Sequence, residues 1–174
     1  ELAMEQQLTQ LTGALLVAVT AFAYLALRAW RNHALEQARV LGDLPPEIGH
    51  TEAQTSEGFY VATTVADEPL NRLKAKGLGM RGRAQIEYSK DGVSVWRVGE
   101  DALHIPISAV LTVDQATAVI DRAVEAGGLS RISWLSNNSG LDTYLRFANG
   151  SEQQKFHAAF AHKANNRHSQ GESK

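Results

Sequence analysis

Five basic side chains lie close together in the sequence, and they have the clearest chemical potential of any residues in it. They are Arg72, Lys74, Lys76, Arg81 and Arg83, and no carboxylate interrupts them between positions 72 and 83. Guanidinium and ammonium groups that converge from one loop hold phosphate oxygens by charge-assisted hydrogen bonds. Anionic lipids attract such residues at about 1 kcal/mol each near a membrane surface. We predict contact with anionic lipid headgroups, and the alternative is a solvated loop whose charges only aid solubility.

The same segment contains a glycine pattern that formally matches a dinucleotide-binding fingerprint. Gly77, Gly79 and Gly82 have the required spacing. That fingerprint opens a helix whose N-terminus holds the pyrophosphate, whereas Gly82 leads into residues 83–88, which alternate as a strand does. A kinase-type glycine loop joins strands, but the rest of a kinase does not fit into 174 residues. We interpret the glycines as residues that let the loop bend tightly before a strand.

The other polar residues do not form a recognisable catalytic or metal centre. The sequence has no cysteine, which excludes disulfides, thiolate zinc sites and cysteine nucleophiles. The histidines lack metal-ligand spacing, and no base is placed to activate Ser133 or Ser136. We expect no cofactor, no metal and no enzymatic activity. A small hydrolase or transferase is kept as a third class, because a missing motif excludes little.

Charge and strand composition argue against a nucleic-acid partner. The formal net charge is -2, whereas nucleic-acid binders are usually basic. The predicted strand faces lack interleaved aromatic and basic residues. Trp96 and Trp134 fall on predicted strands, where we interpret them as core anchors rather than stacking platforms.

A long apolar segment lies near the N-terminus. Residues 6–27 carry no charged side chain, and a helix of this length rises about 33 Å, enough to cross a hydrocarbon core of about 30 Å. We predict a single transmembrane helix, because apolar side chains lie all round it rather than in one stripe. A buried core helix would need a larger surrounding protein. A cleaved secretory signal would need a positively charged start, whereas Glu1 and Glu5 lead this segment.

Basic residues follow the apolar segment and predict its orientation. Arg28, Arg31 and Arg39 are opposed only by Glu36, and basic residues at the end of a span favour the cytoplasm. We therefore expect a plasma-membrane protein with its amino terminus outside and its C-terminal domain in the cytoplasm. The expected segments are an extracytoplasmic N-terminus (1–5), the transmembrane helix (6–27), a juxtamembrane helix and polar linker (28–57), a folded domain (58–163) and a disordered tail (164–174).

The folded domain is predicted to consist of short strands and one closing helix. Asp91-Gly92 and residues 136–140 are typical of hairpin turns. Ser151 with Gln154 predicts a capping box for a helix that lays Phe156 and Phe160 against the sheet. Segment 114–126 fits a helix as well as a strand. The fold class is mainly β with α, a small β-barrel or sandwich closed by a C-terminal helix. The strands are expected at 58–65, 83–88, 93–98, 102–107, 129–135 and 141–147.

Several short pieces of the folded domain carry a resemblance to a known family. They are residues 60–64, Pro69-Leu70 before residues 77–82, Ile105-Pro106, and residues 127–129 ahead of Trp134 and residues 141–143. On these pieces, residues 58–163 resemble the bacterial pleckstrin-homology-like (PH-like) domain found in small actinobacterial membrane proteins with one N-terminal span. The resemblance implies a PH-like barrel with a closing helix, makes segment 114–126 mainly strand and loop, and brings no catalytic residue. Lys76 with Arg81 and Arg83 also resembles the headgroup-binding pattern of eukaryotic PH domains.

The expected function is a membrane-anchored, non-enzymatic PH-like binding or adaptor module at the cytoplasmic face of the plasma membrane. Its expected partners are the lipid bilayer, anionic lipid headgroups and a membrane-protein partner. The alternative is an accessory subunit of a larger membrane transport or export assembly. In that assembly Gly13, Ala14, Ala18 and Ala21 would pack against another helix.

Overall fold

The computed structural model describes residues 2–116, 118–119, 122–123 and 128–161. In the first helix, side chains are described at residues 10, 13–29, 31–32 and 35–41. The chain divides into two units, Glu1–Glu36 and Gln37–Lys174, and each is treated by itself below. The predicted disordered tail, residues 164–174, lies outside the described residues.

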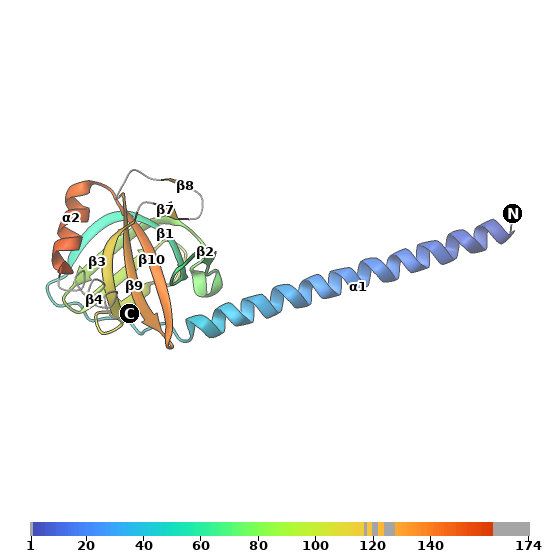
Figure 1. The fold of residues 1–174 in the computed structure, drawn as a ribbon, viewed down its shortest axis with the longest axis horizontal. Helices are drawn as coiled ribbons and strands as arrows, with labels where there is room; N and C mark the ends of the chain where they lie inside the picture. Colours follow the sequence, from blue (N-terminus) through green and yellow to red (C-terminus); the bar gives the residue numbers. More distant parts are fainter. Residues whose placement is uncertain (1, 117, 120–121, 124–127, 162–174) are drawn as a thin grey trace, which may run out of the picture. The chain divides into compact units, whose positions relative to one another are not determined.

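The first helix, α1 (Leu2–Leu41), runs unbroken through the predicted transmembrane segment and into the predicted juxtamembrane helix (Figure 1). Its described side chains from residues 13 to 29 are all exposed. Over the described residues, no helix combines the length and apolar character needed to cross a membrane. The transmembrane span predicted at residues 6–27 is therefore not confirmed, and its side chains 6–9, 11 and 12 lie outside the described residues.

The second unit contains an eight-stranded sheet in which every described pairing is antiparallel. The strands follow the order β5-β4-β3-β1-β10-β9-β6, and β2 pairs with β1 off this path. A separate two-stranded pair joins β7 (Ala118–Val119) and β8 (Arg122–Ala123). The strands of the main sheet are β1 (Gln54–Val65), β2 (Glu68–Arg72), β3 (Gly82–Ser89), β4 (Gly92–Arg97), β5 (Leu103–Pro106), β6 (Val110–Ala116), β9 (Leu129–Ser136) and β10 (Ser139–Phe147).

All six predicted strands are confirmed, within a few residues at their ends. β3 illustrates the reason for this agreement. Its polar and apolar residues alternate in sequence, and its side chains alternate between exposed and buried positions over most of the strand. Segment 114–126 is strand wherever it is described, as the resemblance implied; residues 117, 120–121 and 124–127 lie outside the described residues. β2 was not predicted, since four of its five residues are exposed and leave no apolar alternation.

The predicted barrel or sandwich with a closing helix is confirmed in part, because the sheet bends but does not close. In the described part of the chain, β5 pairs only with β4 and β6 only with β9. These two edge strands are joined by a tight turn in which the backbone N–H of Ala109 donates to the carbonyl of Pro106. Pro106 has no N–H of its own, and proline is tolerated mainly at sheet edges. The sheet is thus bent round its core but ends in two free edges.

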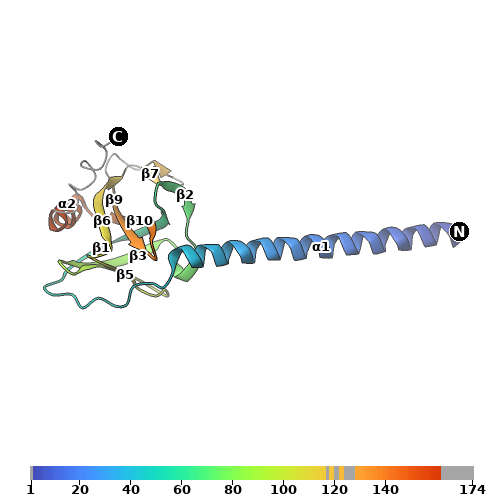
Figure 2. The same cartoon turned by 60° about the horizontal axis from the view of Figure 1, so that its bottom comes forward.

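The core lies on the inner side of the bent sheet and is covered by α2 (Gly150–Ala159), which Figure 2 shows nearly end-on. Phe156 and Phe160 are buried, as predicted. The ring of Phe156 meets Tyr88 edge-on at 5.2 Å between centroids and lies 5.0 Å from the ring of Phe147. Aromatic pairs in such geometries stabilise a core beyond their buried area.

The cap of α2 differs from the prediction. The helix starts at Gly150, so the N-cap is Asn149 and not Ser151. The side-chain oxygen of Asn149 accepts the backbone N–H of Glu152 at 2.9 Å. The Glu152 carboxylate accepts instead from the hydroxyl of Ser56 on β1, at 2.5 Å, and ties the first turn to the sheet.

The second unit begins inside α1. Leu41 is completely buried. The side chain of Gln37 donates to the carbonyl of Arg72 at 3.2 Å and accepts from the backbone N–H of Lys74 at 3.0 Å. Ser136 donates to the carbonyl of Leu41 at 2.5 Å. The last turn of α1 is therefore packed as part of this unit.

Candidate functional site

The basic segment, residues 72–83, is anchored to the core by apolar side chains between its charges. Leu73 and Leu78 are buried, and a short 3₁₀ turn, η1 (Ala75–Gly77), lies between them. The hydroxyl of Tyr60 lies 3.1 Å from the carbonyl of Leu78 and 2.9 Å from the hydroxyl of Thr63. Tyr60 thus holds the backbone of the segment at Leu78, and of the five cations only Lys74 and Lys76 lie between the two buried leucines.

Arg97 on β4 holds the basic segment in place from the buried side of the sheet. Arg97 was not among the residues singled out from the sequence. Its side chain is buried, and its Nη1 donates to the carbonyls of Gly77 at 2.7 Å and Met80 at 3.4 Å. Nη2 donates to the carbonyl of Asp101 at 3.3 Å. The alternation of β4 carries the signal that could have found it, because the strand turns Arg97 to the same buried side as Val95.

The structure separates the five predicted site residues. Arg72 turns inward and donates to the carbonyl of Val61 at 3.0 Å. Lys76 contacts the carbonyl of Gly42 and forms an ion pair with Asp43 at 3.3 Å.

The other three predicted site residues, Lys74, Arg81 and Arg83, are exposed. Within the described residues, none of the three side chains makes a hydrogen bond or an ion pair. No described contact brings any two of the five cations to a shared acceptor, so the loop does not form a closed cradle. Lipid contact by these residues stays a prediction.

Arg83 belongs to a second surface, on the outer side of the sheet. It pairs directly with Phe59 on β1, and Phe59 pairs on its other side with Arg146 on β10. All three side chains are exposed. The statement that no strand face interleaves aromatic and basic residues is therefore wrong, because the pairing of distant strands brings together residues that the linear sequence keeps apart.

An open pocket of about 710 Å³ lies next to Phe59 and Arg83. The residues that line it include Phe59, Arg83, Gln85, Trp96 and Val98. Trp96 is 39% exposed, and its Nε1 donates to Glu87 at 3.3 Å. The interpretation of Trp96 as a core anchor is therefore wrong, since the alternation that buries Arg97 turns Trp96 outward.

For Trp134 the same interpretation is confirmed. Its side chain is fully buried, and its Nε1 donates to the hydroxyl of Thr143 at 2.9 Å.

A chain of hydroxyl and imidazole groups connects the segment before β1 to the sheet. The Asp91 carboxylate lies 3.3 Å from the hydroxyl of Ser89, which lies 2.9 Å from Nδ1 of His50. Nε2 of His50 lies 2.7 Å from the hydroxyl of Ser94, which lies 2.8 Å from Nδ1 of His104. One set of neutral tautomers satisfies every contact, with each group donating towards Asp91. Ser94 is fully buried and has no access to a substrate, so this chain of groups is a packing network.

The electrostatics of this network follow from burial and from its neighbours. Burial lowers the pKa of His104, and nearby His50 acts in the same direction, whereas Glu47 and Glu87 oppose it. The backbone N–H of Thr51, which donates to Asp91 at 2.8 Å, holds the pKa of that carboxyl below its usual value. The neutral imidazole and the ionised carboxylate are thus the forms that this structure favours.

A half-buried ion pair joins β6 and β9. Arg131 donates to both carboxylate oxygens of Asp114, at 2.7 and 2.6 Å. Asp142, which is 2% exposed, accepts from Ser133 at 2.5 Å and lies 4.0 Å from Arg131. The hydrogen bonds that Arg131 donates to the Asp114 carboxylate raise the pKa of Arg131 above its usual value. These charges satisfy one another, which indicates a structural role.

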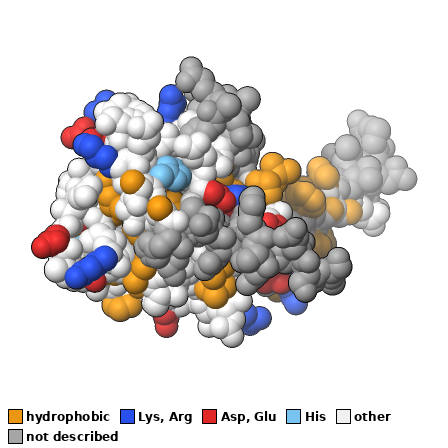
Figure 3. Space-filling view, turned by 60° about the vertical axis from the view of Figure 1, so that its left-hand side comes forward, with side chains coloured by type: hydrophobic (Ala, Val, Ile, Leu, Met, Phe, Trp, Pro, Cys, Tyr) orange, Lys and Arg blue, Asp and Glu red, His pale blue; other side chains and the backbone are white. Residues whose placement is uncertain are grey.

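The described residues form neither a metal site nor, on the face seen in Figure 3, a strongly charged surface. No cluster of His, Asp or Glu within the described residues could hold a metal ion. On the face seen in Figure 3, Lys and Arg side chains are interspersed with Asp and Glu, in keeping with the small net charge. The outer face of the sheet offers an open pocket beside exposed aromatic and basic side chains.

A bent antiparallel sheet with a C-terminal helix packed on its core defines a PH-like domain. The protein-family model described as "Bacterial PH domain-like" matches residues 38–161, and the chain belongs to this family. The match begins in the last turn of α1, where the second unit also begins. A search of curated proteins returned no match.

Proposed function

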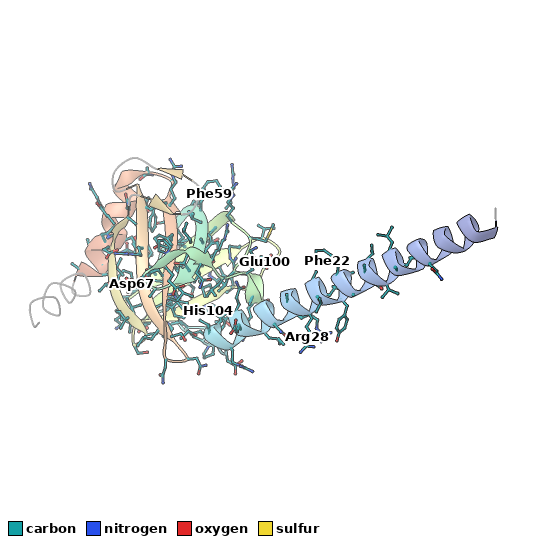
Figure 4. All side chains as sticks on the ribbon, turned by 45° about the vertical axis from the view of Figure 1, so that its right-hand side comes forward. Phe22, Arg28, Phe59, Asp67, Glu100 and His104 are labelled. Atoms are coloured by element: carbon teal, nitrogen blue, oxygen red, sulfur yellow. The ribbon has the colours of Figure 1, made fainter. Side chains whose placement is uncertain are left out.

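We propose that this protein is a non-enzymatic binding or adaptor module whose PH-like domain is attached to a membrane by its apolar N-terminal helix. The observation that carries the proposal is the exposure of apolar side chains along α1. Leu16, Val17 and Phe22 are 66%, 69% and 74% exposed. Figure 4 shows Phe22 and Arg28 projecting from this helix.

These side chains do not form one stripe. Consecutive helical residues are about 100° apart around the axis, so Leu15, Leu16 and Val17 point in three different directions. A single protein surface covers one side of a helix, whereas lipid covers all sides. Large exposed apolar patches mark membrane or protein contact sites, and coverage on every side favours lipid.

The finer parts of the proposal rest on basic residues. Lys74, Arg81 and Arg83 are exposed and would add attraction to an anionic surface. Arg28 and Arg31 follow the apolar segment and support placement of the domain at the cytoplasmic face of the plasma membrane. Membership of the PH-like family supports a binding role.

Membrane flotation of the 174-residue chain tests the attachment. We expect the wild-type chain to float with membranes and to resist extraction by high salt, because burial of apolar area is not screened by ions. The variant Leu16→Glu/Val17→Glu/Phe22→Glu should move to the aqueous fraction. The matched control, Leu70→Ser/Met80→Ser/Leu135→Ser, replaces three exposed apolar residues of the domain and should remain with the membranes. Recovery of the wild-type chain as a detergent-free monomer in the aqueous fraction would overturn the proposal.

A second candidate function is an accessory subunit of a membrane transport or export assembly. One observation favours it: Ala14, Ala18 and Ala21 are exposed and share one side of α1. Small residues let helix backbones approach closely inside a bilayer. Purification in mild detergent should then recover a partner in fixed stoichiometry, and Ala14→Leu/Ala18→Leu should lose it while the chain still floats with membranes.

A further inference from the structure

Three exposed side chains lie in register across the outer face of the sheet: Arg146 on β10, Phe59 on β1 and Arg83 on β3. Directly opposed residues of antiparallel strands have their Cβ atoms about 4.5–5.5 Å apart on one face. Each guanidinium can therefore reach past one edge of the Phe59 ring. We call these three residues the Arg–Phe–Arg row. Phe59 is 47% exposed and is labelled in Figure 4.

Both arginines of the row are uncommitted. Among the contacts of the described residues, neither Arg83 nor Arg146 has a hydrogen bond or an ion pair. Two other strand arginines, Arg97 and Arg131, have their donors engaged by carbonyls or carboxylates. Arginine is suited to planar, two-point recognition of carboxylates. Arg83 and Arg146 are therefore free to bind carboxylates from outside the domain.

The open pocket of about 710 Å³ continues the row towards β4. Its size lies within the range of about 300–1,000 Å³ that is usual for ligand pockets. Trp96 is 39% exposed at its wall, and Val98 is 98% exposed beside it. Exposed Trp and Arg side chains are the residue types that carry most of the binding energy in protein interfaces.

We propose that this surface docks an acidic peptide segment of a partner protein. An aromatic or aliphatic side chain of that segment packs between Phe59 and Trp96, and carboxylates beside it pair with Arg83 and Arg146. The inference deepens the proposed function, on which it rests only in treating the domain as an adaptor.

The charges and shape of the surface favour a peptide over other anions. Glu57 lines the pocket and Glu87 lies beside it, bonded to Trp96. A polyphosphate strand or a flat layer of anionic headgroups would meet these carboxylates, whereas a peptide also offers N–H donors to Glu57 and to the Gln85 amide. A hollow also suits a projecting side chain better than a planar membrane.

Selection from a phage-displayed library of random 12-residue peptides, against the full 174-residue chain in mild detergent, tests this inference. We expect enriched sequences with an apolar residue flanked by Asp or Glu. A synthetic copy of the most enriched peptide is then titrated by fluorescence anisotropy. Arg83→Ala, Arg146→Ala and Trp96→Ala should each weaken its binding by about tenfold or more, as is usual for central interface residues. Lys90→Ala, an exposed cation away from the row, is the matched control and should change nothing.

Several results would overturn the inference. These are the absence of enrichment, the enrichment of basic peptides, and binding that is unchanged in Arg83→Ala/Arg146→Ala. Vesicles of phosphatidylcholine with phosphatidylglycerol form the second arm: if the double variant loses binding to these vesicles and not to the peptide, the row is a lipid contact instead. Both arginines are exposed and unbonded, so the thermal unfolding of the double variant should match wild type.

Membrane attachment is measured by flotation, separately from peptide binding. Arg83→Ala/Arg146→Ala should still float with membranes, because attachment is assigned to α1. If the row fails to bind peptides and flotation is retained, only the further inference is lost. If peptide binding is retained and the wild-type chain does not float, only the proposed membrane attachment is lost.

Discussion

The guanidinium of Arg97 lies over the ring of Tyr60, with 4.4 Å between its central carbon and the ring centroid. This buried cation also supplies donors to the carbonyls of Gly77, Met80 and Asp101. One side chain of β4 thus holds the basic segment, the turn before β5 and an aromatic ring of β1.

Replacement of Arg97 by Ala should therefore be strongly destabilising. We expect a loss of about 3 kcal/mol in the free energy of unfolding, because three carbonyls lose their donors, the buried side chain leaves a void and the cation–π contact is removed. Arg81→Ala is the matched control, since Arg81 is exposed, and should change stability by less than about 0.5 kcal/mol. Urea unfolding followed by far-UV circular dichroism measures both. Equal stability of the two variants would contradict the role given to Arg97.

The two strand tryptophans should respond very differently to truncation. Trp134→Ala removes a fully buried ring and its hydrogen bond to Thr143, and should cost about 3–5 kcal/mol. Trp96→Ala removes a partly exposed ring that packs edge-on against His104, and should cost about 1 kcal/mol or less. Thermal unfolding compares them directly, and a larger loss for Trp96→Ala would contradict the outward placement of its ring.

Acidification should weaken the domain through two histidines. Burial lowers the pKa of both His104 and His157 from the ordinary value of 6.5. The unfolded chain therefore binds protons first as the pH falls below 6.5, and stability decreases by up to about 1.4 kcal/mol per pH unit for each ring until the folded pKa is passed. Well above pH 6.5 both rings are neutral in both states and the effect disappears.

The free energy of unfolding measured between pH 7.5 and 5 tests this slope. His104→Gln/His157→Gln should flatten it. The carboxyls of Asp91 and Glu152, whose pKa values are lowered by hydrogen bonds, add stability that is lost only at lower pH, as the pH falls through their folded pKa values. A slope that survives in the double variant would refute the assignment.

Loss of the Asn149 cap should destabilise α2. Asn149→Ala leaves the backbone N–H of Glu152 without its acceptor, and should cost about 1 kcal/mol. Ser151→Ala, at the position predicted from the sequence to cap the helix, should cost clearly less, because Ser151 lies inside the first turn. Urea denaturation of the two variants under identical conditions distinguishes the caps, and a larger effect at Ser151 would reverse the assignment.

Short-range patterns in the sequence predicted most of the sheet, because alternation and turn residues are local. The same alternation, followed along β4, would have placed Arg97 inside and Trp96 outside, but the general tendency of tryptophan to be buried outweighed it. β2 escaped prediction because exposed residues carry no pattern.

The candidate site was only partly predictable. The five neighbouring cations predicted one shared binding loop. In the structure Arg72 turns towards the carbonyl of Val61 and Lys76 towards the carbonyl of Gly42. Both contacts depend on the direction of the backbone, which the spacing of residues in the sequence does not encode. The Arg–Phe–Arg row joins residues 59, 83 and 146, which only the pairing of three strands brings together.

The burial of Leu41 has a practical consequence for dissecting this protein. A fragment trimmed to start at the first strand would leave an empty volume where Leu41 packs, and would strip Gln37 from the carbonyl of Arg72 and the N–H of Lys74. Such a shortened version should behave as a loosened, aggregation-prone globule even though every strand is retained. The natural place to cut is upstream of Gln37, within the helix itself.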